Sequence, residues 1–397
     1  MDPVTPIKVV DFSNHLSGPM AAHLLVEIGA DVLKVEHPKI GDGNRGNEPL
    51  IAGAGDLHVG LNAGARSIAV STHSPHWPTV VAACASWADA VIVGARPSDA
   101  ARRGLDFASL QKANPEIVYC LISGYGLVGP WADYKAHGQN MDALAGRVDL
   151  EWVDGKPETQ LGWRSAGTSL AGVFGALGAL AGVIRRDRGG GAQFVHTSIW
   201  NTAMWWNWRD INTLANLGHG WNEYQSLGAR YGMYRTSDDR ALLVCPLEQK
   251  FWEAFCDVAE LPAEYRGRGD WTHSMDFGSD DEIPVIAARI ATKSLDDWTN
   301  ILHEAEVPFA PVLTLEEALD SDHAKINQVV RGTTVNDSAV KVAASPVQFH
   351  DDEQGAMNPD LADLSSPPDI GEHTAGILDD IGLSELIGED LAARSPD

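Results

Sequence analysis

The first 125 residues alternate short apolar runs with stretches of helical periodicity. After the first apolar run, Met20, Leu24, Leu25 and Ile28 recur at the spacing of one helix face, and Pro19 suits a first helical turn because its φ is already fixed. Strands separated by helices predict parallel βαβ units with helices on both faces of one sheet. The predicted strands are residues 8–12, 31–36, 67–70, 90–93 and 117–122.

The pattern changes after residue 135. Residues 136–205 are predicted to be mostly helical. The apolar run 169–184 is interrupted by glycines and is shorter than the ~20 residues of a membrane span, so we expect a buried helix there. From about residue 230, the sequence predicts a hairpin around 237–239, a helix beginning near Glu248, and mixed α+β structure to about residue 330.

Length and charge narrow the class of protein. A chain of 397 residues exceeds what one hydrophobic core usually supports, so two or more folding units are expected. The formal net charge is −26, and residues 351–397 hold thirteen acidic side chains against one basic residue, Arg394. Such a surface repels phosphate backbones and anionic lipids, which argues against nucleic-acid and membrane partners.

The cysteines and the N-terminal residues bear on the compartment and on cofactors. The four cysteines form no C-x-x-C pair, and residues 1–12 show no basic and apolar leader pattern. We therefore expect a cytoplasmic protein with reduced thiols and no metal. No G-x-G-x-x-G fingerprint follows the first strand, so NAD is not expected either.

Two segments carry a recognisable pattern. Residues 8–38 read KVVDFSNHLSGPMAAHLLVEIGADVLKVEHP, and residues 117–146 read IVYCLISGYGLVGPWADYKAHGQNMDALAG. The shorter segments LNAGARS, RYGMYRTSD, LEQKFW and GEHT occur in order along the chain. Together these segments resemble the family III CoA-transferases, which include formyl-CoA transferase, carnitine dehydratase and 2-methylacyl-CoA racemase types. The resemblance covers nearly the whole chain.

The resemblance implies an α/β fold with a Rossmann-like large domain built from both chain ends and a smaller α+β domain inserted between them. Residues 1–205 would form the first part of the large CoA-binding domain, 206–229 a linker, and 230–330 the small domain. Residues 331–397 would return to the large domain and end in an acidic helix. The resemblance also implies an interlocked homodimer, with a heteromer containing an Asp-bearing family member as the alternative.

The resemblance further implies coenzyme A, as an acyl-CoA substrate, over the first βα turns. His37 stands where the family commonly has Arg, and Gly94-Ala95 stand where it commonly has Asn-Phe. Both changes remove contacts, because His is mostly neutral at pH 7 and Gly has no side chain. Alternatively, the arginines of residues 96–103 are ordinary helix-surface cations. The residues implied in CoA binding are Leu16, Ser17, His37, Val70, Arg96 and Arg102.

Transferases of the family use an Asp carboxylate that attacks the thioester and then carries CoA as an aspartyl thioester. This Asp stands eight residues before the closing glycine of the second segment, which is the position of Gly138. Asp142 follows one helical turn later, ~5.4 Å along the axis. Attack requires reacting atoms ~3–3.5 Å apart. Asp142 therefore serves as a nucleophile only if the substrate shifts as well.

The racemase branch of the family moves the α-proton of an acyl-CoA with a His and an Asp, and a Glu of the small domain lies nearby. His137 matches that His, and Glu248 matches the Glu. The matching Asp is missing, because no acidic residue occurs between Glu158 and Asp187. A lone His still accepts a proton near neutral pH, so His137 is a candidate base.

Three functions stay open on the sequence. The leading prediction is CoA transfer between an acyl-CoA and a carboxylic acid by an altered site that recruits Asp142 or Glu248. The second is racemase, epimerase or dehydratase chemistry at the α-carbon with His137 as base. The third is a non-catalytic subunit that pairs with a family member retaining the Asp.

Overall fold

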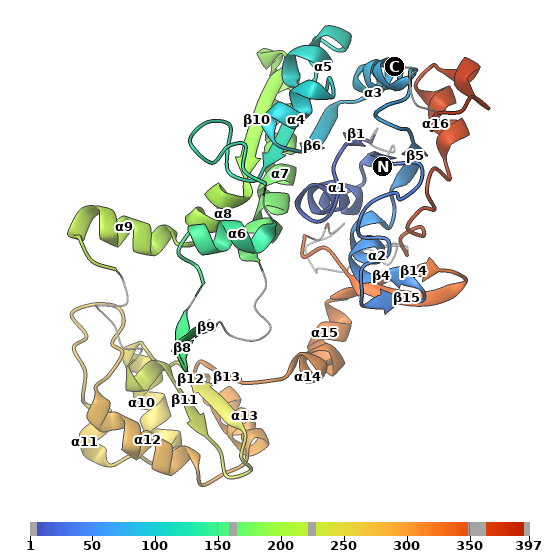
Figure 1. Ribbon diagram of the computed structural model, residues 1–397. Coiled ribbons are helices and arrows are strands. Elements are labelled where there is room, and N and C mark those ends of the chain that lie inside the picture. Colours follow the sequence, from blue (N-terminus) through green and yellow to red (C-terminus); the bar gives the residue numbers. More distant parts are fainter. Residues whose placement is uncertain are drawn as a thin grey trace. The chain divides into compact units, whose positions relative to one another are not determined.

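The computed structural model describes residues 6–135, 137–148, 150–158, 165–220, 228–347, 349 and 363–392. The chain forms two compact units, and Figure 1 shows its course from blue to red. The first unit combines Met1–Trp208 with Gln328–Asp397, and the second unit is Arg209–Asn327. Both ends of the chain therefore belong to the first unit.

A six-stranded parallel sheet forms the centre of the first unit (Figure 1). Its strand order is β10-β7-β6-β1-β2-β5, and every neighbouring pair is parallel. The predicted parallel α/β sheet is confirmed, and the five predicted strands are correct to within one residue at each end. The strands are β1 (Lys8–Asp11), β2 (Asp31–Glu36), β5 (Arg66–Ala69), β6 (Ala90–Gly94), β7 (Val118–Ser123) and β10 (Gln193–Ser198).

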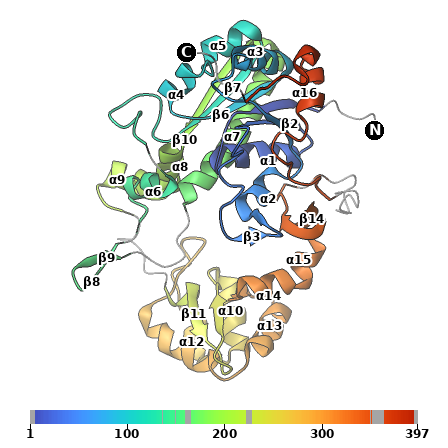
Figure 2. The ribbon, with the colours of Figure 1, turned by 45° about the vertical axis from the view of Figure 1, so that its right-hand side comes forward.

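Strand β10 corrects the prediction that residues 136–205 are mostly helical. It pairs with β7 at one edge of the sheet. Since an edge strand is only partly buried, its sequence QFVHTS lacks the continuous apolar run of the inner strands. The hairpin of β8 (Glu151–Val153) and β9 (Lys156–Glu158) is a second departure. All its residues are exposed, and it stands away from the sheet (Figure 2).

Helices cover both faces of the sheet, because successive residues of a strand point to opposite faces. In β1, Val10 packs in the core with α3, α5 and α16, whereas Val9 packs in the core with α1 and α7. Both faces of the inner strands are thus apolar. These helices are α1 (Ser17–Glu27), α3 (Trp77–Trp87), α5 (Phe107–Ala113), α7 (Ala166–Arg185) and α16 (Thr374–Asp380).

A buried helix was expected at residues 169–184, and helix α7 is buried on one side only. Its glycines and alanines face the sheet and α1, and a Cβ at Gly175 would come 2.6 Å from Ile122 Cδ1. By length and composition, Ala166–Gly190 is long and apolar enough to cross a membrane, but half of its most apolar stretch is buried in the protein. Three larger apolar residues of α7 face outward, whereas Val183 is buried: Val173 is 45%, Leu177 58% and Ile184 51% exposed.

The C-terminal residues 363–392 pack against the β5 side of the sheet. The His373 N–H donates to the Ser67 carbonyl at 3.0 Å, and Arg66 forms an ion pair with Asp380 at 2.5 Å. The last residues therefore complete the first unit. Its other elements are β3 (Leu50–Ile51), β4 (Ala54–Gly55), α2 (Asp56–Asn62), α4 (Pro97–Arg102), α6 (Gly138–Leu144), α8 (Ile199–Trp206), β14 (Val330–Val335) and β15 (Ser338–Ala343).

The second unit is a small α+β fold with an antiparallel sheet of order β11-β12-β13. The hairpin expected around 237–239 is confirmed by the pairing of β11 with β12. The stretch 206–229, expected to be a linker, contains α9, and residues 221–227 lie outside the described residues. The elements are α9 (Trp208–Leu217), β11 (Gly232–Arg235), β12 (Ala241–Val244), α10 (Gln249–Val258), α11 (Ala263–Arg266), α12 (Ile283–Ile290), α13 (Leu295–Glu304), β13 (Phe309–Pro311), α14 (Leu315–Asp320) and α15 (Asp322–Ile326).

Candidate active site

The loops after β1 and β6 approach each other at the carboxyl edge of the sheet. These two strands are neighbours, and β2 lies on the opposite side of β1, so the strand order changes direction here. Open α/β sheets bind ligands in the crevice at such a point. A Cβ at Gly94 would come 2.7 Å from Ser13 Cβ, which shows how closely the loops pack. Leu16 and Ser17 follow Ser13, and Arg96 follows Gly94.

The first turns of α1, α6 and α7 meet near this edge. The Ser17 hydroxyl donates to the Thr168 carbonyl at 2.9 Å, which ties α1 to α7. A Cβ at Gly138, the first residue of α6, would overlap Thr168 Oγ1 and lie 3.0 Å from Ser165 Oγ. Residue 138, where the resemblance implies Asp, therefore lies against the hydroxyl groups of Ser165 and Thr168 at the start of α7.

Asp142 is fully buried beside these hydroxyls. Its Oδ2 accepts a hydrogen bond from Ser165 Oγ, and its Oδ1 accepts one from the Gly167 N–H at 3.2 Å. Arg147 Nε lies 3.4 Å from the same Oδ1 as a counter-ion. A carboxylate at a helix N-terminus is stabilised by the helix dipole, so Asp142 anchors α6 to the start of α7.

The other two candidate catalytic residues lie in different units. His137 is exposed and precedes the first residue of α6, where its backbone N–H donates to Asn140 Oδ1 at 2.8 Å. Glu248 is half-buried and precedes α10 in the second unit. The first unit therefore brings together His137, Gly138 and Asp142 from one short segment, while Glu248 belongs to the second.

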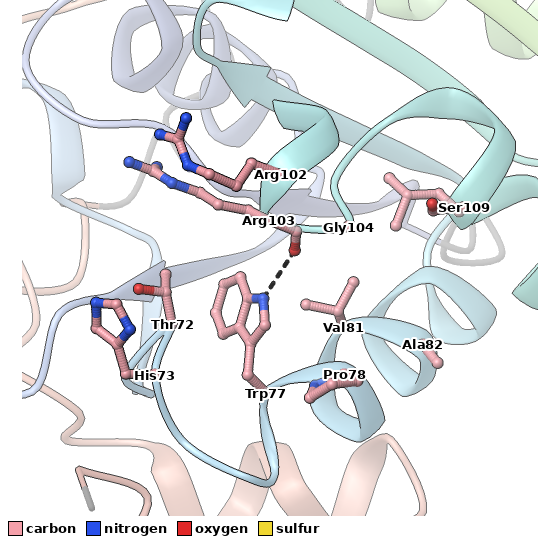
Figure 3. A pocket seen from close by; sticks show the side chains of 11 residues that line it. Thr72, His73, Trp77, Pro78, Val81, Ala82, Arg102, Arg103, Gly104 and Ser109 are labelled. Atoms are coloured by element: carbon pink, nitrogen blue, oxygen red, sulfur yellow. Dashed lines mark hydrogen bonds between the residues drawn. The ribbon is translucent and has the colours of Figure 1, made fainter. Parts of the chain in front are cut away.

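A cavity of about 690 Å³ opens between α3 and the chain that follows α4. Trp77 lies in its wall, and the Trp77 Nε1–H donates to the Arg103 carbonyl at 2.9 Å. Figure 3 shows the guanidinium groups of Arg102 and Arg103 extending to the same side of Trp77, with Thr72 and His73 across from them. The cavity combines a flat aromatic wall with two cations, which suits a phosphorylated nucleoside.

Arg96 and Arg102 share one carboxylate, Asp99. Arg96 Nε donates to Asp99 Oδ2 at 2.7 Å, and Arg102 pairs with Asp99 Oδ1. Burial by itself raises the pKa of Asp99. The hydrogen bonds from the two arginines outweigh burial, so the pKa of Asp99 lies below its ordinary value. Arg96 also donates to the Asp133 carbonyl at 2.7 Å, so it fixes the loop that leads to α6. Arg102 reaches the cavity, and Arg96 is committed to protein partners.

The remaining residues expected to bind CoA take different environments. Val70 is buried, and its N–H donates to the Glu36 carbonyl at 3.0 Å, so its side chain belongs to the core. His37 is exposed, and its Nδ1 accepts from the Lys39 N–H at 3.1 Å. Leu16 is half-buried where α1 begins. Of the six expected residues, Arg102 alone lines this cavity.

A Ser–His pair at the carboxyl edge escaped the sequence analysis. Ser123 Oγ lies 3.0 Å from His196 Nε2, and the Gly126 N–H donates to the same Oγ at 3.1 Å. Burial lowers the pKa of His196, which favours the neutral ring. The pair holds the start of the loop after β7. No sequence signal pointed to it, because His196 lies on the edge strand β10 that periodicity did not predict.

Buried charges support the loop between β1 and α1. Lys34 Nζ lies 3.2 Å from Asp11 Oδ2 and 2.8 Å from Asp42 Oδ2. Burial by itself lowers the pKa of Lys34. The two carboxylates outweigh burial and raise this pKa above its ordinary value. Asp42 Oδ1 in turn accepts from the His15 N–H at 3.1 Å. The ion cluster therefore fixes the turn that leads into α1.

Comparison with known proteins identifies the family. The sequence model of CoA-transferase family III matches residues 5–374. The chain belongs to this family. It is 26% identical to the formyl-CoA:oxalate CoA-transferase of Escherichia coli O157:H7 over 96% of each chain. It is 24% identical to the succinyl-CoA:glutarate CoA-transferase of Mus musculus over 96% of this chain and 87% of that one.

Solved structures of similar proteins show the same fold. A CAIB/BAIF family protein from Brucella suis has a TM-score of 0.72 and 23% identity, over 94% of this chain and 98% of that one. A hypothetical protein from Mycobacterium tuberculosis has a TM-score of 0.76 and 22% identity over the same shares. Family III membership identifies this chain as an enzyme of the CoA-transferase type.

Proposed function

We propose that this family III protein binds an acyl-CoA and transfers CoA from it to a carboxylic acid, with Gly138 in place of the nucleophilic Asp. Relatives matched over nearly their whole length are named for CoA transfer between two acids, which supports this reaction class. The observation that carries the proposal is the cavity with Trp77, Arg102 and Arg103 beside the carboxyl edge of the sheet.

In this proposal the cavity holds the nucleotide end of CoA. The Trp77 ring offers a stacking surface for the adenine, and guanidinium groups pair with phosphate oxygens. Arg102 is shared between CoA and Asp99, while Arg96 and Ser17 act indirectly by fixing the loops beside the thioester. These roles differ because Arg102 lines the cavity, whereas Arg96 and Ser17 do not.

Without a carboxylate at residue 138, the acceptor acid becomes the first nucleophile. Its carboxylate attacks the thioester carbonyl, forming a C–O bond, and the C–S bond breaks to release the CoA thiolate and leave a mixed anhydride. The thiolate then attacks the acceptor carbonyl, and the first acid leaves as a carboxylate. Asp142 is buried with both oxygens already hydrogen-bonded, which supports a route that does not recruit it.

Binding of CoA tests the cavity. The double variant Arg102→Ala/Arg103→Ala removes two charged partners of phosphate, each worth about 1.5–3 kcal/mol. Titration calorimetry with CoA should show a Kd that rises at least tenfold. Arg188→Ala, which removes an exposed cation just beyond α7, is the matched control and should leave the Kd unchanged. An unchanged Kd in the double variant would overturn the assignment.

The reaction is tested by mass spectrometry of an acyl-CoA pool incubated in heavy water with free carboxylic acids. CoA that moves from one acid to another supports the proposal, and Glu248→Gln then tests the predicted role of Glu248. A one-dalton gain without CoA movement would instead indicate proton chemistry at the α-carbon, for which exposed His137 is the candidate base. If CoA does not move and no mass is gained, the proposal that this chain is active by itself would be contradicted.

One relative is named as a subunit, which bears on the outcome in which neither change occurs. The chain is 24% identical to the beta subunit of the succinyl-CoA–L-malate CoA-transferase of Chloroflexus aurantiacus, over 99% of this chain and 97% of that one. In that case transfer activity would appear only when a second, Asp-bearing family member is added. Co-purification followed by the same assay tests this alternative.

We also propose that two copies of the chain associate through α7. The outward face of this helix carries Val173, Leu177 and Ile184, each about half exposed. An apolar stripe of this kind on a helix that already packs by its small residues is typical of a face covered by another chain. An interlocked homodimer, as the resemblance implies, would cover it.

A further inference from the structure

A chain of hydroxyl groups fills the space that a side chain at residue 138 would occupy. Thr168 Oγ1 lies 2.2 Å from where a Cβ of Gly138 would be, and it contacts Ser165 Oγ. Ser165 Oγ in turn contacts Asp142 Oδ2. The three side chains therefore connect the start of α6 with a fully buried carboxylate.

The direction of these hydrogen bonds follows from the number of protons available. A carboxylate only accepts, so Ser165 donates its single proton to Asp142. Ser165 Oγ accepts from the Thr168 N–H at 3.2 Å, and it has one acceptor position left for the Thr168 hydroxyl. Thr168 Oγ1 is therefore the donor to Ser165. Its own lone pairs have no partner among the described residues, and they can accept a proton.

A water molecule that donates to Thr168 Oγ1 would lie close to residue 138. A carboxylate oxygen lies two bonds beyond Cβ, about 2.4 Å away. A water oxygen hydrogen-bonded to the hydroxyl lies about 2.8 Å from it. Since Thr168 Oγ1 lies only 2.2 Å from the position of the missing Cβ, such a water would lie beside residue 138. Gly138 leaves that place free of its own side chain.

We propose that this hydroxyl relay activates a water molecule and that the protein hydrolyses the acyl-CoA thioester. This inference rests on the acyl-CoA binding proposed above and adds water as a second acceptor beside the carboxylic acid. Water is small, neutral and carries the proton that the relay is oriented to receive. An acceptor carboxylate has no such proton, so Thr168 must turn its own proton outward to bind it.

The hydrolytic step balances within the relay. The water oxygen forms a bond to the thioester carbon while its proton moves to Thr168, the Thr168 proton moves to Ser165, and the Ser165 proton moves to Asp142. The C–S bond then breaks, and the thiolate leaves with the proton returned along the same hydroxyls. The products are the free acid and CoA thiol. Arg147, 3.4 Å from Asp142 Oδ1, balances the charge of the relay before the step.

Thr168 itself is poorly placed to attack. It is nearly fully buried in α7. Its oxygen lies 2.2 Å from the Cβ position of residue 138, within the contact between α6 and α7. Near-attack geometry requires about 3–3.5 Å between the reacting atoms. The geometry therefore assigns Thr168 to holding the water, and Ser165 and Asp142 to positioning and proton transfer behind it.

The test uses the full-length protein with acetyl-CoA, butyryl-CoA and succinyl-CoA in ¹⁸O-labelled water, without any added carboxylic acid. A thiol reagent measures free CoA, and mass spectrometry measures ¹⁸O in the released acid. One ¹⁸O per acid, in a 1:1 ratio with CoA thiol, is the expected result. Absence of release by a protein that binds CoA in calorimetry would overturn the relay alone. Absence of CoA binding would overturn the proposed function as well.

Substitutions then locate the activity. Thr168→Val keeps the shape but removes the hydroxyl, and it should slow release by about 10²–10⁴-fold, the range of general base catalysis. Thr168→Ser should retain most of the rate, and Ser169→Ala, a neighbouring hydroxyl outside the relay, should match the wild type. Equal CoA binding by these variants excludes a binding defect. A Thr168→Val rate equal to that of wild type contradicts the proposal.

A second set of variants guards against misfolding. If Thr168→Val does not fold, Ser165→Ala decides, because it breaks the relay and leaves Thr168 in place. Loss of release in Ser165→Ala with retention in Thr168→Ser supports the relay, and equal rates overturn it. Asp142→Asn keeps the shape of the side chain but removes the proton acceptor, so it should also slow release while CoA binding stays unchanged, a combination that a purely structural role would not give.

Discussion

Gly138 and Thr168 compete for one small volume. A Cβ at residue 138 would overlap Thr168 Oγ1, so the two side chains cannot both be present in this arrangement. The Thr168 hydroxyl therefore occupies space that a side chain at residue 138 would need. Because of this overlap, a carboxylate cannot be introduced at residue 138 by one substitution without displacing Thr168.

Restoring the carboxylate should require two changes. Gly138→Asp alone forces Thr168 out of its position, whereas Gly138→Asp/Thr168→Ala provides room for the new side chain. We expect the double variant to transfer CoA at least tenfold faster than the single variant. Mass spectrometry should also detect CoA bound to the protein as a thioester. Equal activity of the two variants would show that Thr168 does not obstruct residue 138.

At the scale of elements, α7 has two apolar faces of different kinds. Glycine and alanine allow the helix to approach α1 and the sheet closely, and they leave the larger residues on the outer side. In the usual surface helix of a single-chain protein, the large apolar residues face the core. In α7, Val173, Leu177 and Ile184 are instead about half exposed. The outer face is therefore the part of the first unit best suited to a second copy of the chain.

A charge on this face should dissociate the dimer. Leu177→Glu replaces a side chain whose burial is worth about 1.5–3 kcal/mol with a carboxylate that is costly to bury. Light scattering after gel filtration should give the mass of a monomer, against a dimer for wild type. Ile40→Glu, at an apolar residue exposed on a loop, is the control and should stay dimeric. A dimeric Leu177→Glu protein would place the interface elsewhere.

At the scale of the whole molecule, buried charges link the two chain ends. Arg45 donates to Glu36, to the Pro368 carbonyl at 2.9 Å and to His58 Nε2 at 3.1 Å. Arginine only donates, so His58 accepts as a neutral ring. Burial, and then the Arg45 charge, lowers the pKa of His58 to about 4. Acid therefore acts on the contact that joins the first strands to the returning C-terminal segment.

The stability of the fold should fall as the pH decreases from about 6.5 to about 4. In this range the unfolded chain binds a proton at His58 and the folded protein does not, so the free energy of unfolding is lost progressively as the pH drops. The full effect is about 3 kcal/mol. Urea unfolding at several pH values should show a shallower slope for His58→Gln. The control His323→Gln, at an exposed residue, should keep the wild-type slope.

The sequence was most informative for features that depend on residues close together in the chain. Five strands of the parallel sheet follow from their apolar runs, because buried parallel strands need apolar residues on both faces. The edge strand β10 lacks that pattern and was missed. The family motifs indicated CoA chemistry and the absence of an Asp at residue 138, since both depend on residue type at a given position.

The tertiary structure decided which groups surround that position. Gly138 and Thr168 are thirty residues apart, and they meet because α6 and α7 begin at the same place. Asp142 resembles a spare nucleophile in the sequence, yet its burial and hydrogen bonds commit it to Ser165 and Gly167. By itself the sequence determined the class of fold and which side chains are available. Contacts between distant segments depend on packing in three dimensions, and so only the folded structure determined which of these side chains can act together.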